Sequence, residues 1–282
     1  MPPSHNMVDL IASNKNKLAS NTKNLVELNQ VGKIFPARRK GTDDVVALRE
    51  TTQSIRRGEI VTIVGPSGCG KTTLLSLIAG LEKPTSGKVF INAHEVSGPY
   101  THSGIVFQKD LLLSWRNVMG NVLLQAEARS FDPESYRARA QTLLDLVGLR
   151  GFENFYPHEL SGGMRQRVSI CRALLHDPEL VLMDEPFAAL DAITRDQLAV
   201  DFDKFVQAGD RTVVFITHNM EEAVFLGDRV MVMTPRPGQI AEVIDIDLPR
   251  PRTLSLKDSS EFTRYTSKVR SLFMEHGVLK DH

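Results

Sequence analysis

The run GPSGCGKT, from Gly65 to Thr72, has the residue types and spacing of a loop that binds nucleotide phosphates. Its glycines allow backbone N–H groups to curl around phosphate oxygens, and a following helix directs its positive end at them. Lys71 is placed to reach the β and γ phosphates, and the Thr72 hydroxyl is placed to bind Mg²⁺. An apolar run precedes the loop and a helical pattern follows it. Because a plain glycine turn does not need that context, the sequence predicts a phosphate site.

Two carboxylates follow a second apolar run, LVLMDEP, which covers residues 180–186. Asp184 lies at the end of this expected buried strand, where it is placed to hold Mg²⁺ through its water shell. Glu185 comes next and is placed to orient and polarise a water molecule for attack on the γ phosphate. This pair favours hydrolysis over transfer to an acceptor. The alternative for Glu185 is a solvated charge at a strand end.

A third apolar run, TVVFITH, covers residues 212–218 and also ends in a polar side chain. We expect these runs to form parallel strands that are buried on both faces, and ligands of such sheets bind beyond the carboxyl ends of the strands. His218 is therefore placed to contact the same phosphate. A lone histidine is, however, more often a helix cap or a structural residue.

The surrounding pattern predicts an α/β fold. The segments LVELNQVGKIF and VVALRETTQSI are typical of antiparallel strands joined by a long hairpin. Between about residues 108 and 165 the periodicity becomes helical, which predicts a helical subdomain inserted into the core. A last helix has Asp258 and Glu261 at capping-box spacing ahead of it. We expect this helix to pack on the core through one face, formed by Phe262, Tyr265, Val269, Leu272 and Phe273.

Composition excludes several classes of protein. The chain has 282 residues, with 34 Lys and Arg against 34 Asp and Glu, so its net charge gives no general attraction to nucleic acid or to an anionic membrane. Two cysteines, Cys69 and Cys171, are too few for a disulfide framework and suit a reducing cytosol. We find no apolar run long enough to span a membrane and no signal-peptide core, and we expect neither export nor a membrane span.

The octet LSGGMRQR, residues 160–167, contains no carboxylate, His or Cys. Ser161, Gly162 and Gly163 stand at the start of an expected helix, where they offer a hydroxyl and free N–H groups to an anion. This second anion site cannot easily serve the phosphate loop of its own chain.

With these motifs in this order, residues 25–249 resemble the nucleotide-binding subunit of an ATP-binding cassette (ABC) transporter. The resemblance implies a P-loop NTPase core, with a mixed sheet and an antiparallel β subdomain, and an inserted α-helical subdomain. The ABC ATPase domain is expected over 25–249, with a helical extension over 250–282. Residues 1–24 are expected to form a flexible tail, because they have little apolar surface to bury. GPSGCGKT then corresponds to the Walker A loop and LVLMDE to the Walker B strand.

The resemblance also implies roles for single residues, with ATP and Mg²⁺ bound. Glu185, His218 and Gln108 are the expected catalytic residues, and Gln108 in IVFQKD corresponds to the Q-loop residue. The expected Mg²⁺ ligands are Thr72, Gln108 and Asp184. The expected nucleotide-binding residues are Phe35, which would stack on adenine, Gly65, Pro66, Ser67, Gly68, Cys69, Gly70, Lys71, Thr72, Thr73, Ser161, Gly162, Gly163 and the D-loop residue Asp191.

In that family the signature motif binds the γ phosphate held by the opposite subunit. Because this chain has one copy of each motif, we expect a dimer with two composite sites, formed with itself or with a similar chain. The usual fifth residue of the signature is Gln, whereas this chain has Met164. The departure puts in doubt a side-chain contact from that position, but not the serine or backbone contacts.

A narrower resemblance links three segments to bacterial importers of nitrate, sulfonate or taurine. They are DLLLSWRNVMGNV, MTPRPGQI and the tail that begins IDIDLPRPR. It implies transmembrane permease subunits as partners, a solute-binding protein as an indirect partner, no nucleic acid, and a location at the cytoplasmic face of the plasma membrane. Trp115 lies where such subunits accept the permease. It is either an exposed anchor or a residue buried in the helical subdomain.

Two other functions fit less of the sequence. A soluble ABC ATPase of DNA repair or translation would carry a long coiled-coil insertion or two tandem cassettes, and this chain shows neither. A phosphate-loop kinase of another class would have no use for Glu185 or for the glycine pair of the signature. An importer for a different small solute stays open, because substrate choice resides in other subunits.

Overall fold

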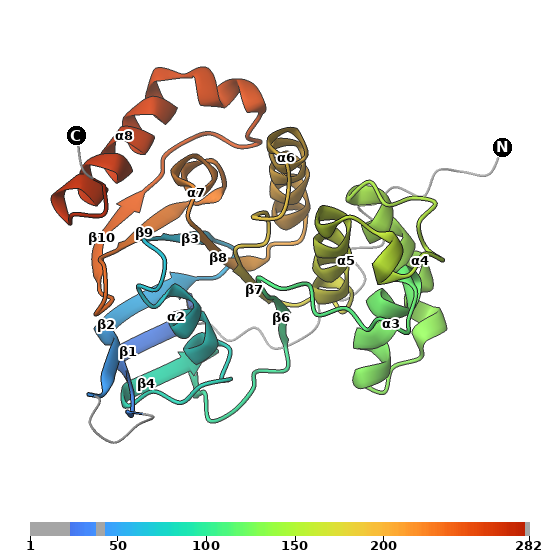
Figure 1. Cartoon of the computed structure of the whole chain (residues 1–282), viewed down its shortest axis with the longest axis horizontal. Coiled ribbons are helices and arrows are strands. Elements are labelled where there is room, and N and C mark those ends of the chain that lie inside the picture. The colour runs from blue at the N-terminus through green and yellow to red at the C-terminus, as the bar shows by residue number, and fades with distance from the viewer. Residues whose placement is uncertain (1–22, 38–42, 280–282) are drawn as a thin grey trace.

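The computed structural model describes residues 23–37 and 43–279, and it contains two sheets (Figure 1). The predicted tail over 1–24 lies, except for its last two residues, outside the described residues. The smaller sheet is antiparallel, with the order β2-β1-β4-β5. Its strands are β1 (Asn24–Phe35), β2 (Val45–Arg56), β4 (Ser86–Ile91) and β5 (His94–Glu95). β1 and β2 pair along most of their length, which confirms the predicted antiparallel pair.

The larger sheet has six strands in the order β10-β9-β3-β8-β7-β6. Only β10 is antiparallel to its neighbour. Side chains alternate between the two faces of each strand, and both faces are apolar, so three central strands are buried at every position. The strands are β3 (Ile60–Val64), β6 (Ser103–Val106), β7 (Leu180–Asp184), β8 (Thr212–Thr217), β9 (Arg229–Met233) and β10 (Ile240–Asp245).

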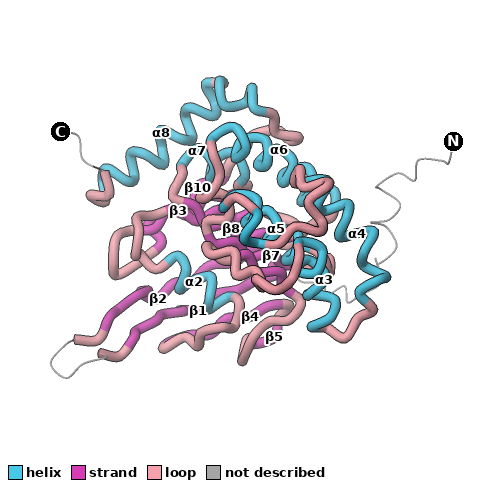
Figure 2. Tube along the Cα trace, turned by 45° about the vertical axis from the view of Figure 1, so that its right-hand side comes forward, coloured by secondary structure: helices cyan, strands magenta, loops and turns pink. Residues whose placement is uncertain are grey.

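Helices cover both faces of the larger sheet (Figure 2). On one face, α2 (Lys71–Ile78) packs between the two sheets, where Leu74 and Ile78 share a core cluster with residues of both. The other face carries α6 (Ala192–Ala208), α7 (Met220–Leu226) and α8 (Ser260–Glu275). This arrangement, together with the helices described next, confirms the predicted α/β fold.

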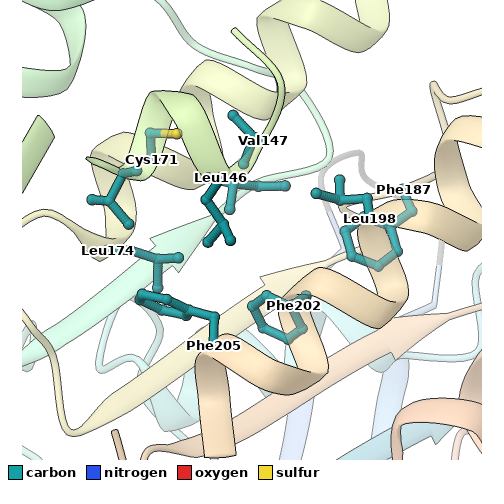
Figure 3. A pocket seen from close by; sticks show the side chains of 10 residues that line it. Leu146, Val147, Cys171, Leu174, Phe187, Leu198, Phe202 and Phe205 are labelled. Atoms are coloured by element: carbon teal, nitrogen blue, oxygen red, sulfur yellow. The ribbon is translucent and has the colours of Figure 1, made fainter. Parts of the chain in front are cut away.

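Three helices form the group at the right of Figure 1: α3 (Val118–Ala128), α4 (Pro133–Leu146) and α5 (Gly162–Leu174). The last of them continues beyond the predicted limit near residue 165. α4 and α5 meet α6 across an apolar seam that surrounds a small cavity (Figure 3). Phe187, Phe202 and Phe205 line this seam from the core side, and Leu146, Val147, Cys171 and Leu174 line it from the helical side.

The C-terminal helix packs on the core as predicted, with Phe262, Val269 and Phe273 buried and Tyr265 and Leu272 partly buried. Its cap differs from the prediction by one residue: Ser259, not Asp258, accepts a hydrogen bond from the N–H of Phe262. Both residue types are good N-caps, so composition could not choose between them.

The segment ahead of this helix is fixed by Arg252, whose side chain is fully buried. Its guanidinium donates hydrogen bonds to the carbonyls of Val224, Phe225 and Gly227 at the end of α7. Among the described residues, no helix is long and apolar enough to cross a membrane.

Candidate functional site

The polar residues predicted at strand ends meet at one edge of the larger sheet. The register pairs Val64 with Thr217, Asp184 with Ile216, and Val106 with Met183. The carboxyl ends of these four strands therefore lie side by side. The phosphate loop follows β3, His218 follows β8, Glu185 follows β7, and Gln108 comes shortly after β6.

The phosphate loop leads directly into α2. Gly70 is the N-cap residue at φ 110°, a left-handed conformation that is costly for any residue with a Cβ. Lys71 is almost fully buried, and its Nζ donates to the carbonyls of Gly65 and Pro66 at 2.8 and 3.0 Å. An ammonium group has three donors, so one remains for a phosphate oxygen. The helix N-terminus and this cation together form an anion site.

Thr72 and Asp184 supply the oxygen atoms expected of a magnesium site. The Thr72 hydroxyl donates to Asp184 Oδ2 at 2.8 Å. Burial raises the pKa of the Asp184 carboxyl and nearby Glu185 adds to the effect, whereas the Thr72 hydroxyl and Lys71 oppose it. The described residues contain no group of three or more His, Cys, Asp or Glu side chains arranged for a metal ion. One carboxylate and one hydroxyl fit Mg²⁺ held mainly by substrate phosphates, because Mg²⁺ does not need an all-protein cage.

Glu185 is the point where the three expected catalytic side chains converge. Its Oε2 accepts from Gln108 Nε2 at 3.3 Å and lies 3.2 Å from His218 Nδ1. Its φ of 48° is in the left-handed region, a strained conformation for a non-glycine residue that is found preferentially at functional sites. The Glu185 side chain is 16% exposed, whereas that of His218 is 59% exposed. His218 is not the cap of α7, because Asn219 fills that place.

Phe35 lies at the end of β1, opposite Val45, at the rim of the smaller sheet. Its ring is half-buried, and Lys33 Nζ lies 4.8 Å from the ring centroid. A partly exposed aromatic ring is suited to stacking on a base. The loop that follows it falls partly outside the described residues.

The signature segment begins α5, as predicted. Ser161 is the N-cap, and its Oγ accepts from the N–H of Met164 at 3.2 Å. Ser161 and Gly162 are exposed, while the Met164 side chain packs partly buried against the core cluster. Within the described part of the chain, no hydrogen bond joins Ser161 to the phosphate loop. The D-loop residue Asp191 is likewise exposed and caps α6 through the N–H of Thr194.

Sequence reasoning missed the residues of α5 that hold the segment around Gln108. Gln166 donates to the carbonyl of Phe107, and Arg165 forms an ion pair with Asp110 at 2.9 Å. Arg172 donates to the carbonyls of Asp110 and Leu111. The signature helix therefore positions the Q-loop of its own chain. Arg165 and Arg172 are seven residues apart, which places them on one face of a helix, and this spacing was the only sequence signal.

Comparison with known proteins places these motifs in a family. Residues 48–188 match the family model for ABC transporters. An uncharacterized ABC transporter ATP-binding protein of Methanocaldococcus jannaschii is 48% identical over 84% of this chain and 87% of the relative. A taurine import ATP-binding protein of Jannaschia is 46% identical over 70% of this chain and 73% of the relative. An aliphatic sulfonates import ATP-binding protein of Bacillus cereus is 38% identical over 90% of this chain and 98% of the relative.

A solved structure agrees with the sequence relatives. A dimeric ATP-binding cassette in a post-hydrolysis state, bound to ADP and Pi, superposes with a TM-score of 0.71 at 31% identity, over 79% of this chain and all of that chain. The chain therefore belongs to the ABC transporter family, as an ATP-binding subunit that hydrolyses ATP.

Proposed function

We propose that this chain is the ATP-hydrolysing subunit of an importer for a small anion and that Glu185 is its general base. The observation that carries the proposal is the convergence of Gln108 and His218 on the Glu185 carboxylate, at the sheet edge that also holds the phosphate loop. A carboxylate held by two polar side chains is oriented to accept a proton from water.

The reaction follows from this placement. Backbone N–H groups of residues 65–72 and the Lys71 ammonium bind the phosphates, and the Phe35 ring stacks on adenine. Glu185 takes a proton from water as the water oxygen bonds to the γ phosphorus and the bond to the ADP oxygen breaks. Gln108 and His218 orient the Glu185 carboxylate. Thr72, Asp184 and Gln108 would hold Mg²⁺, which would supply positive charge to the phosphate oxygens.

The working unit is a dimer with two shared sites. The N-terminus of α5 exposes Ser161 and Gly162, and the Arg165 guanidinium lies beside it, since a Cβ at Gly162 would be 3.8 Å from Arg165 Nη2. A γ phosphate held by a second copy supplies the missing ligand. The dimeric cassette among the solved relatives supports this assembly.

The membrane partner binds at the helical subdomain. Trp115 is 72% exposed, which favours an anchor over a buried residue, and Leu111, Phe155 and Tyr156 are also exposed. The N–H of Val118 donates to the carbonyl of Phe155, so the chain around Trp115 lies beside the segment that carries the other two rings. Aromatic side chains of this kind are typical anchors of an interface. The protein would thus act at the cytoplasmic face of the membrane, on permease subunits that receive their solute from a solute-binding protein.

The transported solute is a small anion of the sulfonate class, such as taurine or an aliphatic sulfonate, with nitrate as a related choice. The names of two groups of relatives support this assignment. Substrate selection itself takes place in the other subunits.

The test is Glu185→Gln, with Glu221→Gln as the matched control. The control makes the same change at an exposed residue in the first turn of α7. We expect phosphate release by the Glu185 variant to fall by about 100-fold or more, with ATP affinity retained, because loss of a general base costs about that much. The control should keep wild-type turnover. Unchanged turnover in the Glu185 variant would show that another group is the base.

A further inference from the structure

The turn between β9 and β10 packs against the back of the phosphate loop. It runs from Thr234 to Gln239 and is closed by two hydrogen bonds between these residues, one of which the Thr234 hydroxyl accepts. Gly238 in this turn forms a β-bridge with Leu48 of β2. This turn of the larger sheet therefore contacts strand β2 of the smaller sheet.

Gly238 approaches the phosphate loop more closely than a residue with a side chain could. A Cβ at this position would lie 1.8 Å from the backbone carbonyl oxygen of Cys69 and 3.0 Å from its carbonyl carbon. Real Cβ atoms do not approach a carbonyl oxygen so closely, and the obstacle is backbone rather than the end of a movable side chain. Only glycine allows this contact at the observed backbone positions.

Hydrogen bonds fix the same contact from the side of β2. The N–H of Gly238 donates to the carbonyl of Ala47 at 3.2 Å, and the N–H of Arg49 donates to the carbonyl of Gly238 at 2.8 Å. The Ala47 carbonyl also lies against Gly70, where a Cβ would be 2.6 Å away. The Cys69–Gly70 backbone is thus enclosed by β2 and by the β9–β10 turn.

We infer that Gly238 is a positioning residue for ATP binding: its close contact with the Cys69 carbonyl holds the amides of the phosphate loop in the conformation that binds ATP. The inference rests on the proposed role of residues 65–72 as the phosphate site. The catalytic side chains Glu185, Gln108 and His218 follow other strands. A displaced Cys69 carbonyl should therefore weaken ATP binding more than it slows the chemical step.

Gly238→Ala is the direct test, and Gly98→Ala is the matched control, since a Cβ at Gly98 meets no atom within 4 Å. For Gly238→Ala we expect the Kd and the KM for ATP to rise by about tenfold to a hundredfold, with kcat at saturating ATP changed by less than about threefold. Gly98→Ala should match the wild type. Kd is measured by equilibrium dialysis with radiolabelled ATP, and KM and kcat by phosphate release.

A second variant covers the case in which Gly238→Ala does not fold. Thr234→Val keeps the side-chain shape but removes the hydroxyl that accepts from the Gln239 N–H, so it loosens the turn. Its Kd for ATP should rise about threefold, as expected for the loss of one neutral hydrogen bond. A melting temperature measured without nucleotide separates this effect from a general loss of stability.

The inference is overturned if both variants bind ATP within about twofold of the Gly98 control, even where the melting temperature falls. It is also overturned if Gly238→Ala lowers kcat and leaves Kd unchanged. Lys71→Ala distinguishes the two proposals. If this variant binds ATP as the wild type does, the phosphate site itself is wrongly assigned; if it loses ATP while Gly238→Ala does not, only the role of Gly238 fails.

Discussion

The phosphate loop and the signature segment are both anion sites at helix N-termini, but the structure builds them differently. At α2, Lys71 is buried beside the loop carbonyls, and backbone from β2 and from the β9–β10 turn packs behind the loop. At α5, Ser161 caps the helix and is exposed, and the nearby Arg165 guanidinium donates to Asp110 and to the Leu160 carbonyl. We therefore propose that the first site holds phosphate within one chain and that the second completes a site held by another copy.

Comparing Lys71→Ala with Ser161→Ala tests this difference most strongly. Loss of the ammonium should raise the Kd of the isolated chain for ATP by roughly 100-fold, because a hydrogen bond from a buried cation to a phosphate oxygen is lost. Ser161→Ala should leave that Kd unchanged while it lowers steady-state turnover. Equilibrium dialysis on dilute protein measures the first effect, and phosphate release the second. Equal losses of affinity in the two variants would contradict the asymmetry.

We propose that the helical subdomain contacts the membrane subunits around Trp115. When the protein is produced together with its membrane subunits, Trp115→Ala should reduce the copurified fraction by about tenfold or more, since an exposed aromatic anchor dominates such interfaces. Phe131→Ala is the matched control, because Phe131 is also exposed on this subdomain but stacks on Tyr136. ATP turnover of the isolated chain should not change. Equal copurification of the two variants would remove Trp115 from the interface.

Mixing two inactive variants tests whether the sites are shared. Lys71→Ala keeps the signature, and Ser161→Arg keeps the phosphate loop. In an equal mixture about half of the dimers are mixed and each has one complete site, so turnover should recover to about a quarter of the wild-type value. Each variant alone gives the baseline. A mixture that stays at this baseline would show that the two sites do not cooperate across chains.

The junction between the helical subdomain and the core should make stability depend on pH. Burial lowers the pKa of His176 to about 4, and Arg129, whose Nη2 lies 3.0 Å from the imidazole, adds to the effect. The unfolded chain therefore binds the proton more readily between about pH 6.5 and 4, and the free energy of unfolding should fall as the pH falls through this window, by at most about 1.4 kcal/mol per pH unit.

Urea unfolding of His176→Gln at several pH values checks this dependence. The variant should show a shallower loss of stability than the wild type over the same window. His158→Gln provides the control, because His158 is exposed. A wild-type slope in the His176 variant would mean that other groups cause the pH dependence.

The sequence was sufficient to predict those site residues that come directly after a predicted strand or at the start of a predicted helix. Asp184, Glu185 and His218 each follow a short apolar run, and parallel strands bring such ends together. The N-cap of α5 was recognisable from the glycine pair that follows it in the chain. By contrast, Gly238 meets Cys69 from a turn far along the chain, and no periodicity indicates which turns will touch. The expected role of Gln108 likewise came from family resemblance rather than from spacing, and its contact with Glu185 was not predicted.

Burial of both native cysteines has a practical consequence. Cys69 and Cys171 are free and buried, and burial raises the pKa of each thiol, so little thiolate forms at neutral pH. A single cysteine introduced at a surface position such as Ile193, which is 84% exposed beside the D-loop, would therefore be the thiol that a maleimide probe modifies first. Because its own thiols are buried, the wild-type chain needs no removal of cysteines before spectroscopic or cross-linking measurements of how two copies approach each other.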